Sequence, residues 1–158
     1  MTPRIRRAVR AVLLDQRDDV LLVRFEFPTA TVWALPGGGL DDGESAELGL
    51  RRELREELGL TDFHLGPHIW NREHIIPMIT GHDGQQDQIH LVRVDRFEPE
   101  PTIGWEQMRA ENVHEIRWWS LAEIGAASDT RFAPTALFEL LTDLLMYGAP
   151  REPIDTGI

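Results

Sequence analysis

The chain has 158 residues, which suits one domain with a single core, and its 42% hydrophobic content argues against wholesale disorder. It has no cysteine and all 16 basic residues are arginine, which excludes disulfides, thiolate metal sites, a cysteine nucleophile and lysine Schiff-base chemistry. The net charge of −11 argues against a nucleic acid polymer as a partner, and no apolar run is long enough to span a membrane.

The N-terminal part is predicted to form strands. We expect three of them, at Val9–Leu14, Val20–Phe25 and Thr31–Leu35. A polar hairpin turn at Asp15–Asp19 joins the first two, and the glycines of Gly37–Gly39 predict a loop. The basic cluster of Arg4, Arg6, Arg7 and Arg10 is interpreted as a solvated face of the first strand. Arg10 and Asp15 also interrupt the apolar stretch that a signal peptide needs, so we expect a cytoplasmic protein.

The second half of the chain predicts a mixture of strands and helices. The expected strands are Ile75–Thr80, Gln88–Val94 and Ile116–Trp119. We expect loops at Gly81–Asp87 and Glu98–Gly104, one helical turn at Leu121–Ile124 and a final helix at Pro134–Tyr147. The domain is therefore predicted to cover residues 1–147, with a tail at 148–158 that is mobile or packs on a neighbouring subunit, such as the second copy in a homodimer.

One helix, predicted at Ser45–Leu58, is the most informative element. Its buried stripe is expected to consist of Ala46, Leu50, Leu54 and Leu58. Asp42 or Ser45 could cap its start, and Gly59 stands where a left-handed C-terminal cap belongs. Gly49 inside the helix costs about 1 kcal/mol relative to alanine; either the loop or the substrate passes close to the backbone there, or the glycine reflects chance or close packing against another element.

Three glutamates gather on one edge of this helix. At about 100° per residue, Glu53, Glu56 and Glu57 fall beside the apolar stripe, and Glu57 lies within its margin. A solvated acidic face should instead lie opposite the stripe. Like charges within one turn repel one another, and a partly buried carboxylate is costly unless it is paired. A bound hard cation removes both penalties, so we expect a divalent metal site.

The segment around this helix resembles a known signature. From Gly38 to Leu60 the sequence reads GGLDDGESAELGLRRELREELGL, which resembles the Nudix box. Every constrained position of the box is filled, by Gly38, Glu44, Arg52, Glu53, Leu54, Glu56, Glu57, Gly59 and Leu60. The strands and the Trp-Ala-Leu-Pro-Gly-Gly segment before the box are also similar to the Nudix family.

The resemblance implies an α/β (α+β) fold, namely an α/β/α sandwich with a mixed sheet. It also implies a Nudix hydrolase that cleaves a diphosphate linkage in a small nucleoside diphosphate derivative, of the nucleoside triphosphate or ADP-sugar type. By position in the box, Glu53, Glu56 and Glu57 would bind Mg²⁺ or Mn²⁺, with a contribution from the Gly37 carbonyl. Arg52 would orient a box glutamate, either Glu44 or Glu53, and these residues join the catalytic set.

Two functional assignments stay open at this point. In the family the general base is either the glutamate at position 53 or an acid on a distant loop; the loop candidates are Glu98, Glu111 and Glu115, and we prefer Glu111. Pro77 weakly favours ADP-ribose as the substrate. The aromatic candidates for base stacking are Phe25, Phe27, Trp33 and Trp70. The alternative to an enzyme is a non-catalytic domain that senses a nucleotide.

Overall fold

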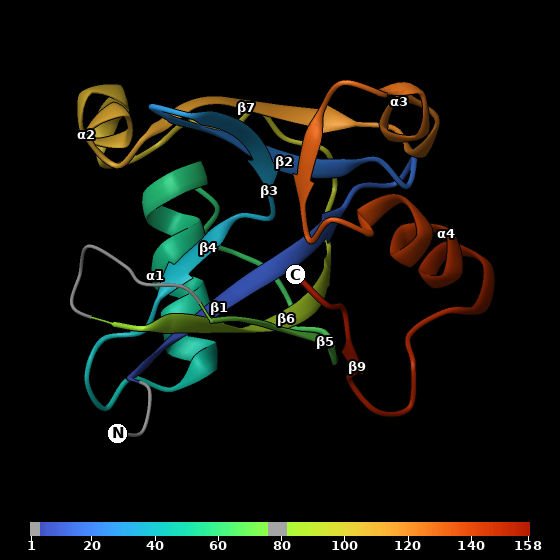
Figure 1. Cartoon of the computed structure of the whole chain (residues 1–158), viewed down its shortest axis with the longest axis horizontal. Coiled ribbons are helices and arrows are strands. Elements are labelled where there is room, and N and C mark those ends of the chain that lie inside the picture. Colours follow the sequence, from blue (N-terminus) through green and yellow to red (C-terminus); the bar gives the residue numbers. More distant parts are fainter. Residues whose placement is uncertain (1–3, 76–81) are drawn as a thin grey trace.

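A computed structural model describes residues 4–75 and 82–158 of the chain (Figure 1). Over these ranges the chain forms one sheet and four helices. The strands are β1 (Ile5–Leu14), β2 (Val20–Phe27), β3 (Ala30–Ala34), β4 (Gly37–Gly39), β5 (His68–His74), β6 (Gly84–Arg93), β7 (Val113–Trp119), β8 (Arg131–Ala133) and β9 (Ile154–Asp155). The helices are α1 (Ala46–Leu58), α2 (Gly104–Ala110), α3 (Leu121–Ala126) and α4 (Leu137–Tyr147).

The sheet divides into two halves at β1 and β2. These strands are antiparallel and are bridged at Leu14 and Val20, beside the turn that joins them. Further along, β1 pairs instead with β4, at Ala8–Arg10, while its other edge pairs in parallel with β6 over the whole strand. β2 continues into the second half by pairing with β3 and β7. The order β8-β3-β2-β1-β6-β5-β9 is therefore mixed, as predicted.

Helices cover both faces of the sheet, which confirms the predicted sandwich. One buried cluster joins alternate residues of β1 to α1: Val9, Ala11, Leu13, Leu50, Leu54 and Leu58. The intervening residues of β1 join α4 on the other face: Val12, Leu14, Leu137, Leu141 and Leu144. Each leucine buried in this way contributes roughly 1.5–3 kcal/mol to stability. The period-2 pattern of β1 therefore fixes which face α1 covers.

Several predictions about elements were wrong for identifiable reasons. Gly37–Gly39 is a strand and not a loop, because its backbone pairs with β1 without needing side chains. β6 begins at Gly84, inside the predicted loop. The polar residue Asp87, which suggested a loop, is buried in this strand because it forms ion pairs with Arg10 and Arg72. The expected strand Ile75–Thr80 lies outside the described residues except for Ile75, as does Pro77, and the strand of this region is β5. The final helix begins at Leu137, after an Ala133–Pro134 segment that belongs to no helix.

The C-terminal tail packs on the chain's own sheet. β9 extends this sheet by pairing in parallel with β5, and the Thr156 amide donates to the Asn71 carbonyl (2.9 Å). The Thr135 amide also donates to the Ile158 carbonyl (2.8 Å). A contact of residues 148–158 with a neighbouring subunit stays a prediction. Among the residues described, no helix is both long and apolar enough to cross a membrane.

Candidate active site

The helix α1 presents the glutamates of the box from a well-defined frame. Of the two capping candidates, Ser45 caps the helix, since its hydroxyl accepts from the Leu48 amide (3.2 Å). Gly59 ends it in the left-handed conformation predicted for the C-terminal cap, at φ 71°. With the apolar stripe buried against β1, the carboxylate of Glu57 is carried inward and is 7% exposed. The position of Glu57 at the edge of the apolar face of α1 therefore follows from the helical period.

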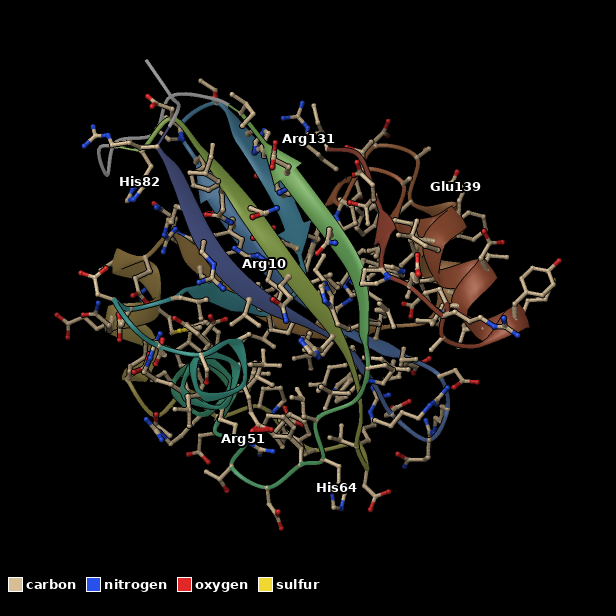
Figure 2. All side chains as sticks on the ribbon, turned by 90° about the horizontal axis from the view of Figure 1, so that it is seen from below. Arg10, Arg51, His64, His82, Arg131 and Glu139 are labelled. Atoms are coloured by element: carbon tan, nitrogen blue, oxygen red, sulfur yellow. The ribbon has the colours of Figure 1, made fainter. Side chains whose placement is uncertain are left out.

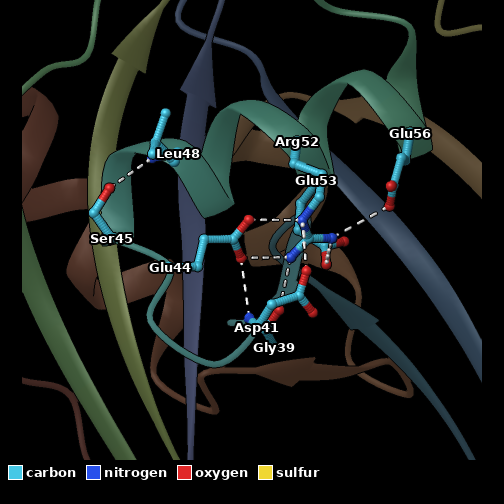
Figure 3. A network of polar contacts seen from close by, with 8 residues as sticks. All are labelled: Gly39, Asp41, Glu44, Ser45, Leu48, Arg52, Glu53 and Glu56. Carbon is cyan, nitrogen blue, oxygen red and sulfur yellow. Dashed lines mark hydrogen bonds and ion pairs between the residues drawn. The ribbon is translucent and has the colours of Figure 1, made fainter.

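Arg52 holds the loop before α1 against the helix (Figure 3). Its Nη2 and Nε donate to the two carboxylate oxygens of Glu44 (2.8 and 2.9 Å). Its Nη1 donates to Glu53 (2.9 Å) and, at 3.4 Å, to Glu56. The Arg52 hydrogen bonds and the Asp41 amide lower the pKa of Glu44 to about 2. The resemblance to the Nudix box left open whether Arg52 orients Glu44 or Glu53, and in the structure it contacts both.

Two glycines allow the loop and the helix to approach closely. A side chain on Gly38 would stand 2.7 Å from the Cδ atom of Glu53, so only glycine leaves room for that carboxylate. Inside α1, a side chain on Gly49 would collide with Leu40 of the loop and crowd Glu44. Of the neighbours considered for Gly49, it is the loop before α1 that lies against its backbone. The cost of this glycine in the helix is offset by the fit of the loop that carries Glu44.

Glu53 and Glu57 form a pair of like charges with incomplete compensation. Burial raises the pKa of Glu57 well above its usual value, and the negative charge of Glu53 raises it further. Arg10 and a backbone hydrogen bond from Gly37 act in the opposite direction. Within the described part of the chain, the Oε2 atom of Glu57 has no hydrogen-bond partner. The site therefore has unmet capacity to hold positive charge.

This pair lines a cavity of about 340 Å³, which we call the acidic cavity. Its carboxylates come from Glu53 and Glu57 of α1 and from Glu111, which follows α2. The backbone of Gly37–Gly39 forms another part of its lining. Partial burial raises the pKa of Glu111, and the charges of Glu53 and Glu56 raise it further. An acid that is distant in the sequence, Glu111, thus interacts electrostatically with the glutamates of α1.

The other predicted candidates lie in different places. Glu98 lines a separate hollow at the C-terminal end of α1, and Glu115 on β7 accepts from Arg24 Nε (3.1 Å). Trp33 and Trp70 are buried in the core beneath α4, so they are not free to stack on a base. Phe25, by contrast, lines the acidic cavity. The structure therefore separates the predicted residues into a group around α1 and a group outside it.

The donor set suits a hard divalent cation. A buried and unpartnered carboxylate oxygen on Glu57, beside the carboxylate of Glu53, is a ligand set that Mg²⁺ or Mn²⁺ would stabilise. Within residues 4–75 and 82–158, however, no three acidic or histidine side chains already converge in a metal-ligating cluster. Glu56 is turned toward Arg52. Binding of a metal would therefore involve a rotation of that side chain.

Two arginines of the site were missed by the sequence analysis. Arg6 and Arg10 on β1 line the acidic cavity, and Arg10 Nη1 donates to the Leu35 carbonyl (2.9 Å). Figure 2 shows Arg10 on β1 near the centre of the view, whereas Arg131 and Glu139 lie at the periphery, and only 15% of the Arg10 side chain is exposed. The signal was available: Arg10 shares the β1 face of Val12 and Leu14, so an inward arginine breaks a buried stripe. Interpreting the whole basic cluster as solvated was wrong for this residue.

A mixed sheet between helices, with an acidic helix beside a cavity, defines a mixed α/β protein of the Nudix type. The model of the NUDIX domain family matches residues 4–140, so the chain belongs to this family, as the box predicts. The chain is 42% identical over 60 residues to "Nucleoside triphosphatase NudI" of Salmonella arizonae. That match covers 38% of this chain and 43% of the relative, so it spans less than half the length of that protein.

Solved structures share the fold at low sequence identity. The MutT protein from Methanosarcina mazei Go1 has a TM-score of 0.67 at 21% identity, with 90% of this chain and 96% of that chain covered. The NUDIX domain of Shewanella oneidensis NrtR, complexed with ADP ribose, has a TM-score of 0.63 at 19% identity. There 92% of this chain and 89% of that chain are covered. These likenesses confirm the predicted fold.

Proposed function

We propose that the chain hydrolyses a diphosphate linkage in a nucleoside diphosphate derivative, with the acidic cavity as its active site. The observation that carries this proposal is the Glu53–Glu57 pair at the wall of a cavity that Arg6 and Arg10 also line, in which Glu57 is buried and has an unpartnered oxygen. Glu53, Glu56 and Glu57 would hold Mg²⁺ or Mn²⁺, with the Gly37 carbonyl as a further ligand. When bound, the metal would neutralise phosphate oxygens and lower the pKa of a coordinated water.

The residues of the chain divide the remaining work. Arg6 and Arg10 carry positive charge on the cavity lining, where they would attract and orient the phosphates of the substrate. Arg52 is a positioning residue, because it bonds Glu44 and Glu53 from the side of the loop and so fixes the carboxylate of Glu53. Phosphoryl chemistry depends mainly on such positioning and on charge stabilisation.

Glu111 is our choice for the general base. Water attacks one phosphorus, the bridging P–O bond breaks, and the proton of the water passes to the Glu111 carboxylate. Its raised pKa suits this role, since a base is most effective when its pKa approaches the working pH. Glu53 is the alternative base, but its Oε1 already accepts from Arg52 (2.9 Å), which makes it a weaker proton acceptor.

The proposal is tested by measuring phosphate and pyrophosphate release from a panel of nucleotides. The panel contains nucleoside triphosphates and ADP-ribose, each with Mg²⁺, with Mn²⁺ and with a chelator. We expect turnover of at least one compound that the chelator abolishes. Nucleotide binding seen by calorimetry without any turnover would instead support the non-catalytic sensor.

A further inference from the structure

A second cavity lies beside the acidic cavity at the division of the sheet. It has a volume of about 570 Å³, and we call it the split-sheet cavity. It shares the lining residues Arg6, Arg10 and Phe25 with the acidic cavity, so the two adjoin. Other lining residues come from β2, β3, β5 and β6, on both sides of the division. Its volume is within the usual range for sites that bind small molecules.

One part of its lining is a flat aromatic surface. Phe25 and Phe27 stand two residues apart on β2, so their side chains share one face of the strand. Their rings are parallel within 1°, with centroids 5.9 Å apart, and Phe27 is 47% exposed. An aromatic surface of this kind offers a stacking partner to any nucleobase, because each base has a π-face. It favours a base in the split-sheet cavity without selecting which one.

A second part of the lining is an arginine whose donors are poorly used. Arg72 on β5 lies directly opposite Asp87 on β6, and its Nη1 donates to Asp87 over a long distance, 3.5 Å. A guanidinium has five N–H donors. Among the described residues Arg72 has this one hydrogen bond, and its buried Nε atom has no partner. Its side chain is only 13% exposed, and burial lowers its pKa, so within the described part of the chain most of its donors are withdrawn from solvent and unused.

Asp87 is not available to a ligand in the same way. It is 1% exposed and already accepts from Gln85 Nε2 (2.7 Å), while Arg10 Nε lies 3.3 Å from it. Its role is to hold Arg72 and Arg10 at the lining of the cavity. A base that enters the split-sheet cavity would therefore meet donors from Arg72 and no acceptor from Asp87.

We propose that the split-sheet cavity binds the nucleobase of the substrate and that Arg72 selects bases that present a carbonyl oxygen over bases that present an amino group. This inference rests on the proposed function. A carbonyl oxygen would accept from the unused N–H groups of Arg72, whereas an amino group would place donor against donor. The substrate class is thus a nucleoside diphosphate derivative with an oxo base, in preference to adenine derivatives, including ADP-sugars.

Two pairs of substrates differ at this edge of the base. ITP and ATP differ in the 6-oxo or 6-amino edge of the purine, and UTP and CTP differ at the equivalent edge of the pyrimidine. We expect kcat/KM of the wild type to favour ITP over ATP and UTP over CTP by about 10- to 100-fold, the range for a hydrogen bond to a charged group. In Arg72→Gln, both ratios should fall below about 3-fold, mainly through loss of the oxo substrates.

The controls separate specificity from folding and from catalysis. Arg93→Gln makes the same change on β6 at an exposed arginine that pairs with Asp18 (3.1 Å), and it should leave both ratios unchanged. Arg72→Lys keeps a charge beside Asp87 if the glutamine variant does not fold. Equal rates for ITP and ATP in an active wild type, or an unchanged ratio in a folded Arg72 variant, would overturn this inference alone. Absence of turnover with every nucleotide would overturn the proposed function itself.

Discussion

Replacing Glu57 by glutamine removes one negative charge from the acidic cavity and leaves the shape of the side chain nearly unchanged. If Glu57 holds the metal, turnover should fall by at least about 100-fold, the scale for loss of a metal or electrostatic stabiliser. The same change should not damage the fold. The wild-type carboxylate is buried beside Glu53 with one oxygen unpartnered, whereas a glutamine amide can donate to the Glu53 carboxylate.

The size of the stability effect follows from that exchange. Removing the cost of a buried charge at position 57, while keeping a hydrogen bond to Glu53, is worth about 1 kcal/mol. For a domain of this length, an increase of that size in the free energy of unfolding corresponds to a rise in the metal-free Tm of about 2–4 °C. Mg²⁺ should then raise the Tm of the wild type more than that of Glu57→Gln, because a ligand of the native state stabilises it.

The assay compares turnover and melting curves with and without Mg²⁺ for the wild type, Glu57→Gln and Glu47→Gln. Glu47 is a suitable control because it is exposed on the same helix, in a weak 3.8 Å pair with Arg51. It should behave like the wild type in both measurements. Near-normal turnover of Glu57→Gln, combined with an undiminished Mg²⁺ response, would refute the assignment of Glu57 to the metal.

Three further predictions concern proton-binding groups. A base acts only when it is deprotonated, and the pKa of Glu111 is raised, so wild-type turnover should rise with pH through that pKa. In Glu111→Gln this rise should disappear from the pH–rate profile. If the rise persists in the variant, Glu53 is favoured as the base. Arg52 lowers the pKa of Glu44 to about 2, so this pair stabilises the fold above about pH 4.5 and its contribution is lost as pH falls toward 2. Urea unfolding across that range should show a steeper loss for the wild type than for Glu44→Gln. Burial lowers the pKa of His90, so the unfolded chain binds its proton first and stability should fall as pH drops below about 6.5. Melting at pH 7.5 and 5.5 should show a smaller loss for His90→Gln, and an equal loss would exclude His90 as the cause.

The helix α1 could be predicted in detail because its signals are local. Capping by Ser45, termination at Gly59 and the stripe that carries Glu57 inward all depend on residues within a few positions of one another. The glycine at 49 was also informative, since its cost in a helix indicated a close neighbour, and Leu40 is that neighbour. Here the sequence pattern and the tertiary structure agree.

Elements that depend on distant partners were beyond the same reasoning. β4 consists of three glycines, and its pairing with Ala8–Arg10 has no side-chain signal. α2 has seven residues and no side-chain cap at its start, so nothing in its sequence marks where it begins. β9 pairs with β5 across more than 80 residues of sequence. In each case the strand or helix is stabilised by a contact that the local sequence does not specify.

The residues proposed for the reaction depend on local sequence, whereas those proposed for substrate preference depend on contacts between distant strands. The glutamates of the box are brought together by one helix and one adjoining loop, so a sequence that keeps the box keeps their arrangement. Arg72 is brought to its cavity by its pairing with Asp87, and Arg10 by the register of β1 with β6. A change in either pairing alters the lining of the split-sheet cavity without touching α1. Substrate preference can therefore differ among chains with the same box, and for this chain it has to be inferred from the strands.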